Sequence, residues 1–271
     1  YLVEGGPDNY SNFLFHCAHL IEPEETTKPL PAQPLPKAGI YWPDQTIKSI
    51  DDIKTHWDLS QPITAITFYR ALLQSGDLDP IDQLIKDLIK QGLNPLPIFA
   101  SSLKDQVAKD IIADIFSEAK PSTIINTTSF AISKPGTDWQ GTILDRSETP
   151  VFQALLSGSN KDTWQENPRG LISRDIAMNV TLPEIDGRIT TRAISFKSDF
   201  GRDENVETSL VGHKAEPDRT EFVAKLAASW SKLQSTEIEK RKVALILSNY
   251  PSNDGRIANG VGLDTPAGTI K

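Results

Sequence analysis

The stretch Ile63-Thr-Ala-Ile-Thr-Phe-Tyr69 opens the part of the chain that decides the fold, because it is a largely apolar run rich in β-branched residues. Such a run is typical of a β-strand. The sequence then predicts four further elements: a helix from Asp79-Pro80 to Gly92, a strand over 96–100, a helix over 102–115 and a strand over 122–127. Strands that alternate with single helices through short loops indicate a parallel, doubly wound α/β sheet.

The carboxyl ends of these strands are where a doubly wound sheet binds its ligands. Tyr69-Arg70, Ser101-Ser102 and Asn126-Thr-Thr-Ser-Phe130 stand at those ends. Neither G-x-G-x-x-G after the first strand nor G-x-x-x-x-G-K-[ST] occurs in the sequence, so no nucleotide fingerprint accompanies them. We therefore expect that this segment does not bind ATP by itself.

The flanking segments suggest three parts. Residues 1–61 comprise a predicted helix over 8–21, with Leu14 and Ile21 on a face expected to be core, and a proline-rich linker. Residues 62–241 form the α/β region, in which Thr149-Pro150 predicts the start of a helix that Gly158 ends. Residues 242–271 read as the start of a further, truncated α/β unit: a buried strand over 242–247, a polar loop and a helix start at Thr265-Pro266. This interruption leads us to expect a piece of a larger protein.

A β-hairpin inserted in the α/β region is predicted at 179–197, around Leu182-Pro-Glu-Ile-Asp-Gly-Arg188. Residues 179–182 and 189–196 favour strands, and the Asp186-Gly187 pair between them favours a tight turn, which needs positive φ. Glu184, Arg188 and Arg192 add more charge than a turn requires. This density of charge indicates a functional site.

Composition excludes several classes of protein. The chain has 271 residues, 38% of them hydrophobic, which is enough to fill a core, and its formal net charge of −8 argues against a general binder of nucleic acid or anionic membranes. The single cysteine cannot form an internal disulfide, and no long apolar run or signal peptide is present. A cytoplasmic location is therefore expected by default.

Several longer strings resemble the large subunit of the cobaltochelatase and magnesium chelatase family. The stretches that carry the resemblance are 180–188, 191–197 and 248–268, with shorter support at 68–70, 102–105 and 169–175. The magnesium branch usually continues the Pro-Glu-Leu-Asp-Gly motif with a second glycine where this chain has Arg188, so the likeness is closer to the cobaltochelatase (CobN) branch. The family subunit is far longer, which agrees with a truncated last unit.

The resemblance implies an ATP-dependent metal chelatase. It implies a subunit that binds a tetrapyrrole and inserts cobalt into a corrin precursor, hydrogenobyrinic acid a,c-diamide, in cobalamin biosynthesis. Cobalt or magnesium would be the substrate metal, and ATP would be used by separate AAA+ ATPase and accessory subunits. The alternatives are magnesium insertion into protoporphyrin IX, or a binding or scaffold region of the same assembly with the chemistry elsewhere.

The resemblance and the chemistry together select the candidate residues. Metal insertion removes two protons from pyrrole nitrogens, a task that suits a carboxylate, and Glu184 is the candidate to accept a proton, to hold the metal transiently, or both. Asp186 is its candidate catalytic partner, although a role in the turn would also explain it. The peripheral carboxylates and amides of the macrocycle favour Arg and Asn, and the substrate-binding candidates are Arg188, Arg192, Asn249, Arg256 and Asn259. Each of these has an alternative role in a salt bridge or a turn.

Overall fold

The structure, a computed structural model, describes residues 1–133, 141–145, 149–247 and 265–270. It divides into two compact units, Tyr1–Gln234 and Ser235–Lys271. None of the helices in these described ranges is long and apolar enough to cross a membrane.

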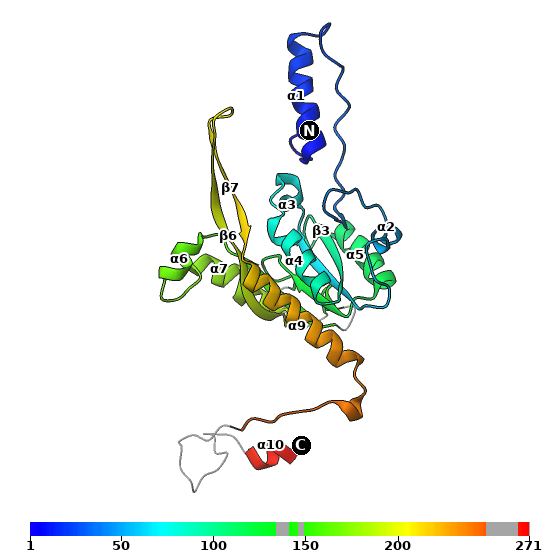
Figure 1. The fold of residues 1–271 in the computed structure, drawn as a ribbon, viewed down its shortest axis with the longest axis vertical. Helices are drawn as coiled ribbons and strands as arrows, with labels where there is room; N and C mark the ends of the chain where they lie inside the picture. The colour runs from blue at the N-terminus through cyan, green and yellow to red at the C-terminus, as the bar shows by residue number, and fades with distance from the viewer. Residues whose placement is uncertain (134–140, 146–148, 248–264, 271) are drawn as a thin grey trace. The chain divides into compact units, whose positions relative to one another are not determined.

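The first unit is built on one seven-stranded sheet among the described residues, in the order β1-β3-β2-β4-β5-β6-β7 (Figure 1). The strands are β1 (Ala38–Ile40), β2 (Ile63–Tyr69), β3 (Asn94–Ala100), β4 (Thr123–Asn126), β5 (Val151–Leu156), β6 (Ile189–Asp203) and β7 (Thr208–Ala215). The inner strands from β3 to β6 run parallel, and the edge strands β1 and β7 are antiparallel to their neighbours. The chain passes from β2 to β3 on one side and then to β4 on the other, so the strand order reverses at β2.

Helices cover both faces of this sheet. They are α1 (Pro7–Ile21), α2 (Ile50–Lys54), α3 (Arg70–Ser75), α4 (Asp79–Lys90), α5 (Gln106–Ala119), α6 (Lys161–Glu166), α7 (Ser173–Asp175), the π-helix η2 (Ile176–Thr181), α8 (Leu182–Ile185) and α9 (Pro217–Ser235). One apolar core joins one face of the sheet to α2 and α5, and a second joins the opposite face to α4 and α9. The predicted doubly wound α/β fold is confirmed.

The predicted elements between β2 and β4 are confirmed, with shifts of a few residues at their ends. β2 pairs with β3 from Ile63↔Asn94 to Tyr69↔Ala100, and with β4 from Thr64↔Thr123 to Thr67↔Asn126. Ala65, Ile66 and Phe68 are fully buried, as a strand at the centre of a covered parallel sheet requires. Gly92, with a φ of +72°, follows the end of α4.

The predictions for residues 149–158 and 179–197 are wrong. The helix predicted over 149–158 is strand β5, whose central position buries both faces and removes the alternation that would have distinguished it from a helix. Residues 179–182 are helical, so the hairpin predicted at 179–197 is absent. A hairpin does follow, but it is made by β6 and β7, with Lys197 opposite His213.

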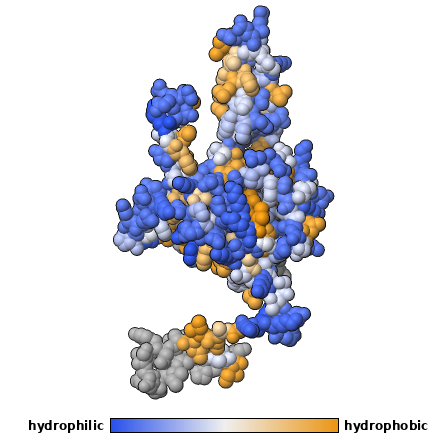
Figure 2. Space-filling model, viewed as in Figure 1, coloured by the Kyte–Doolittle hydropathy of each residue, from blue (hydrophilic) through white to orange (hydrophobic). Residues whose placement is uncertain are grey.

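The helix predicted over 8–21 is present as α1, but its expected core face is not buried. Leu14 and Ile21 are 67% and 78% exposed, and Figure 2 shows apolar side chains on this helix at the surface. The side chain of Asn9 is the buried one, because it bonds to the backbone of Gly5 and Gln33.

The second unit comprises a 3₁₀ turn at Ile238–Lys240, residues 241–247 without regular structure, and the helix α10 (Thr265–Ile270). The buried strand predicted over 242–247 is wrong: Val243 and Ile246 are 89% and 92% exposed. A buried strand requires neighbours, and none of the described strands pairs with this run. α10 begins at Thr265, where a helix start was predicted. The division at 61/62 and 241/242 stays a prediction.

Phe152 tests the position of β5 at the centre of the sheet. Its side chain is fully buried, and its ring meets that of Trp230 edge-on with centroids 5.9 Å apart. We expect Phe152→Ala to lower the free energy of unfolding by about 3–5 kcal/mol, because the cavity lies between the sheet and α9. Urea unfolding measures this loss, with Leu59→Ala, at a residue that is 75% exposed, as the control. A loss within about 0.5 kcal/mol of that control would contradict the packing.

Candidate functional site

The motif Leu182-Pro-Glu-Ile-Asp-Gly-Arg188 forms the last turn of a helical run over 173–185 and leads into β6. Pro183 lies in α8, which continues the π-helix η2 without a break. The N–H groups of Asp186 and Gly187 donate to the carbonyls of Pro183 and Glu184, both at 3.0 Å. Gly187 has a φ of +71°, so the positive φ expected of the Asp-Gly pair is present. A left-handed glycine can end a helix as well as turn a hairpin, and here Gly187 follows the end of α8.

Asp186 and Arg188 turn inward from this motif and form a buried ion pair. The Arg188 Nη2 and Asp186 Oδ2 atoms are 3.0 Å apart, and both side chains are at most 2% exposed. Asp186 also accepts hydrogen bonds from the backbone N–H of Ile132 and from the N–H and hydroxyl of Ser133. Burial lowers the pKa of Arg188, and the charge of Asp186 opposes that shift. The pair therefore fastens the motif to the loop after β4.

A buried polar network extends the ion pair across the sheet. Arg188 donates to Gln153 Oε1 at 3.2 Å, and Asn126 donates to the same oxygen at 2.7 Å. Asn126 in turn accepts from the hydroxyls of Thr67 and Thr128. Each of these partners is at most 1% exposed, apart from Arg188 at 4%. The network thus connects β2, β4 and β5 to the start of β6 without contact with water.

Glu184 lies on the opposite side of the helical turn and is exposed to solvent. Its carboxylate accepts a hydrogen bond from the hydroxyl of Thr190, at 3.3 Å, near the start of β6. Of the three charged residues in the motif, Glu184 is therefore the one that solutes can reach. Among the described residues, no cation forms an ion pair with the Glu184 carboxylate.

The other sequence-predicted residues do not gather around Glu184. Arg192 lies on the face of β6 that α9 covers, with its guanidinium carbon 3.6 Å from the centre of the Phe222 ring. Asn249, Arg256 and Asn259 lie outside the described residues. In the part of the chain that the structure describes, no cluster of three or more His, Cys, Asp or Glu side chains is arranged to hold a metal ion.

A small crevice of about 120 Å³ lies where the strand order reverses. It is lined by residues that follow the carboxyl ends of β2, β3 and β4: Tyr69, Ser102, Leu103, Lys104, Thr128, Ser129, Phe130, Ala131 and Ile132. The sequence had indicated this edge, including Tyr69, Ser102 and the stretch Asn126-Thr-Thr-Ser-Phe130. Ile132, which lines the crevice, donates its backbone N–H to Asp186, so the loop that forms the crevice is anchored to the motif.

Backbone strain marks the loop between the crevice and the motif. Phe130 has a φ of +67°, which is unfavourable for a bulky side chain, and its ring is 42% exposed. Its N–H donates to the carbonyl of Met178 in η2 at 2.8 Å, and the neighbouring Ser129 hydroxyl donates to Asn179. Strained residues persist where the surroundings hold them, and they concentrate at functional sites.

Sequence reasoning missed the residues that build this support. Gln153 was predicted to lie in a helix, and Asp175, part of a stretch that carries the family resemblance, was given no role, although it accepts from the hydroxyl of Ser157 and the N–H of Gly158. The available signal was a lone amide, Gln153, in the otherwise apolar run 151–156. A polar side chain in such a run requires a buried partner.

The fold and this site define a doubly wound α/β region with a small crevice at its topological switch point and an exposed carboxylate, Glu184, beside a buried ion pair. The chain belongs to the CobN/magnesium chelatase family, whose model matches residues 1–271. It is 44% identical to an aerobic cobaltochelatase subunit CobN from Sinorhizobium sp. and 39% identical to one from Pseudomonas aeruginosa, in both cases over 100% of this chain. It spans 22% and 21% of the lengths of those relatives.

A solved structure, the catalytic subunit of cobaltochelatase from Mycobacterium tuberculosis, resembles this chain with a TM-score of 0.73 and 27% sequence identity. The match covers 98% of this chain and 21% of that subunit. The predicted family is confirmed.

The ion pair between Asp186 and Arg188 generates a prediction about stability. We expect Arg188→Met to lower the free energy of unfolding by about 3–5 kcal/mol, because it leaves a buried carboxylate without its cation. The double variant with Asp186→Asn should lose less than the sum of the two single losses, since it removes both charges. Chemical denaturation of the four proteins measures both effects.

Arg202→Met is the matched control for that cycle. The guanidinium of Arg202 pairs with Glu204 and Glu207 at 3.9 and 3.8 Å, but all three side chains are exposed. Such pairs contribute about 0–1 kcal/mol. Equal losses for Arg188→Met and Arg202→Met would show that the buried pair does not support the site.

Proposed function

We propose that this chain is part of the tetrapyrrole-binding catalytic subunit of an ATP-dependent metal chelatase that inserts cobalt into a corrin precursor, hydrogenobyrinic acid a,c-diamide, in cobalamin biosynthesis. Membership of the family supports the chelatase class. The names of the two relatives above, both aerobic cobaltochelatase subunits, support cobalt over magnesium. Because the chain spans about a fifth of those relatives, the activity is proposed for the longer protein that contains it.

The observation that carries the proposal is the difference in exposure among the charged residues of the motif. Asp186 and Arg188 are locked together inside the protein, whereas Glu184, two residues away, is left exposed with one weak partner, Thr190. A carboxylate on a rigid mount is what proton transfer requires, because the group must meet its substrate in a fixed geometry. We therefore assign the reactive role to Glu184.

Metal insertion requires a base because two pyrrole nitrogens lose their protons as the metal binds. In the proposed reaction, the Glu184 carboxylate accepts a pyrrole proton, and it also offers an oxygen ligand to the incoming cation before transfer. Thr190 orients the carboxylate through its hydroxyl. The metal is a substrate that passes through the site.

Asp186 and Arg188 take positioning roles in this proposal, in place of the catalytic and substrate-binding roles expected from the sequence. The oxygens of Asp186 are occupied by Arg188, Ile132 and Ser133, so its carboxylate is not placed to receive a proton from a substrate. The guanidinium of Arg188 is likewise committed to Asp186 and Gln153. Their substitution would move Glu184 and the β4 loop together.

We assign recognition of the peripheral carboxylates and amides of the macrocycle to the remaining candidate residues. Arg192 is half-buried, and its guanidinium lies over the Phe222 ring; we assign its N–H donors to a carboxylate of the macrocycle. Asn249, Arg256 and Asn259 stay predictions for amide and carboxylate recognition. ATP would be hydrolysed by separate AAA+ subunits, because the sequence carries no phosphate-binding loop, and we propose a cytoplasmic location for the assembly.

Glu184→Gln in the full-length protein tests the assignment, because it keeps the shape of the side chain and removes the base. With the ATPase partners, a corrin precursor and Co²⁺, we expect turnover to fall by at least about 100-fold, within the range that a general base contributes. The dissociation constant of the macrocycle, titrated by absorbance, should change by less than about threefold.

Glu204→Gln is the control, since Glu204 is an exposed carboxylate at the tip of the β6–β7 hairpin. Unchanged turnover in Glu184→Gln would remove the catalytic assignment and favour a binding or scaffold role for this region. Parallel assays with protoporphyrin IX and Mg²⁺ decide between the two branches of the family.

A further inference from the structure

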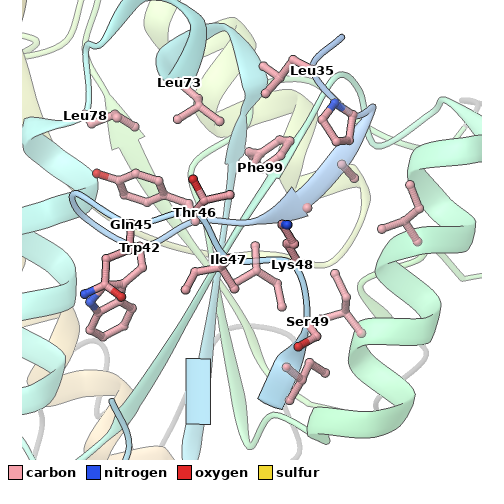
Figure 3. Close-up of a pocket in the computed structure, with 18 of the residues that line it drawn as sticks. Leu35, Trp42, Gln45, Thr46, Ile47, Lys48, Ser49, Leu73, Leu78 and Phe99 are labelled. Atoms are coloured by element: carbon pink, nitrogen blue, oxygen red, sulfur yellow. The ribbon is translucent and has the colours of Figure 1, made fainter. Parts of the chain in front are cut away.

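A groove of about 1030 Å³ lies at the β1 edge of the sheet (Figure 3). All of β1 lines it, together with Tyr41, Trp42, residues 44–50, parts of α3 and α5, and Phe99. The Glu184 motif and the crevice at the switch point contribute no residue to its lining. This groove therefore requires an explanation of its own.

The backbone of β1 leaves hydrogen-bonding groups without partners along the groove. The carbonyl of Lys37 accepts from Ser101 and the N–H of Tyr41 donates to Pro97, so every second residue of this segment, Gly39 included, faces β3. In an antiparallel pair the intervening residues direct their N–H and C=O groups the other way. Ala38 and Ile40 thus point theirs toward the open edge, where no described residue meets them with a hydrogen bond.

The two residues that carry these edge groups expose little surface. Ala38 and Ile40 are only 3% and 8% exposed, and an unpaired backbone group that is buried costs free energy. The chain beyond β1 does not supply the partner: it makes one antiparallel bridge, Trp42 with Gln45, and residues 46–49 then run on without pairing to β1. A strand added at this edge would satisfy the N–H and C=O groups of both residues.

Apolar side chains flank the edge on both faces of the sheet. Leu73, Leu78 and Phe99 pack with the core on the α4 side, while Ile111 and Ile115 pack with the core on the α5 side. Figure 3 shows Leu73, Leu78 and Phe99 around the ribbon of β1. Side chains of a strand alternate between the two faces, so a peptide paired with β1 would place successive apolar residues against one flank and then the other.

The rim of the groove is acidic. Asp8, Asp44, Asp114 and Glu118 line it, against a single lysine, Lys48. Glu118 is partly balanced by Lys54, at 3.4 Å, whereas Asp44 and Asp114 form no ion pair with any described residue. Charge complementarity therefore favours an occupant that carries basic side chains.

We propose that the β1 groove binds an extended, basic peptide segment of a partner protein by β-strand addition. The peptide pairs its backbone with Ala38 and Ile40, places consecutive apolar side chains on the two flanks, and brings Lys or Arg to the acidic rim. The interaction does not depend on the metal-insertion activity, and it gives this region of the subunit a means of attachment to another polypeptide.

A labelled peptide of about ten residues, with about five consecutive valines between flanking lysines, is the probe, and fluorescence anisotropy with the full-length protein is the measurement. We expect binding to this peptide, because consecutive residues of a strand face opposite flanks of the groove. A peptide of the same composition with valine and lysine in strict alternation turns all its lysines toward one apolar flank, so it should bind at least about tenfold more weakly, and so should one with glutamate in place of lysine. Equal binding of the three peptides would overturn the proposal, because it would show adhesion without strand pairing.

Two variants place the binding on β1. Ala38→Pro removes an outward N–H and leaves the ladder to β3 intact, so it should weaken binding by about three- to tenfold. Asp114→Lys should weaken it by about two- to fivefold, whereas Asp110→Lys, one turn earlier on α5 and outside the groove, should not.

Asp114→Lys keeps the test decisive if Ala38→Pro fails to fold, since Asp114 is an exposed helical residue. Identical affinities for Asp114→Lys and Asp110→Lys would contradict the acidic rim. Absence of binding to the full-length protein would show that the groove is already filled within the longer chain, and would overturn the proposal as well.

Discussion

The buried ion pair between Asp186 and Arg188 is the interaction on which the site depends. Two opposite charges at 3.0 Å, almost wholly removed from water, are tolerable only when each is also hydrogen-bonded, and both are. Asp186 holds the loop after β4, and Arg188 reaches Gln153 in β5, so a motif of seven residues is tied to three strands. The consequence is a short helical turn whose orientation is set by the core of the sheet.

That orientation gives a physical reason for the composition of the motif. α8 is the last turn of a short helical run over 173–185, and Asp186 and Arg188, which follow it, anchor its end to the core. Gly187 provides the left-handed ending that lets Asp186 and Arg188 both turn inward, and Glu184 is left facing outward. The strained Phe130 loop is fixed by the same support, which places the crevice and the carboxylate on one rigid body.

Much of the fold could be predicted from the sequence, but the site only in part. The strands and helices from β2 to β4 follow from apolar runs and helical stripes joined by short loops, and these local signals agree with the tertiary structure. β5 could not be recognised, because a strand buried on both faces has no alternation, and Asp186-Gly187 is equally suited to a hairpin turn and a helix end. Besides Asp186, the partners of Arg188 are Gln153 and the carbonyl of Thr128, which are 35 and 60 positions away in the chain, so these contacts exist only once the sheet has formed. Glu184 was identified through the family resemblance, and its exposure is what the structure adds.

The central claim is that a carboxylate at position 184 performs the chemistry while the buried pair beneath it provides the mount. Chemical rescue tests it most directly: turnover of the full-length Glu184→Gly variant, with its ATPase partners, is measured against increasing formate. The account predicts almost no metal insertion without formate and a rate that rises with its concentration, because the small carboxylate enters the space that the side chain leaves. Full activity without formate, or a lost activity that formate leaves unchanged, would contradict it.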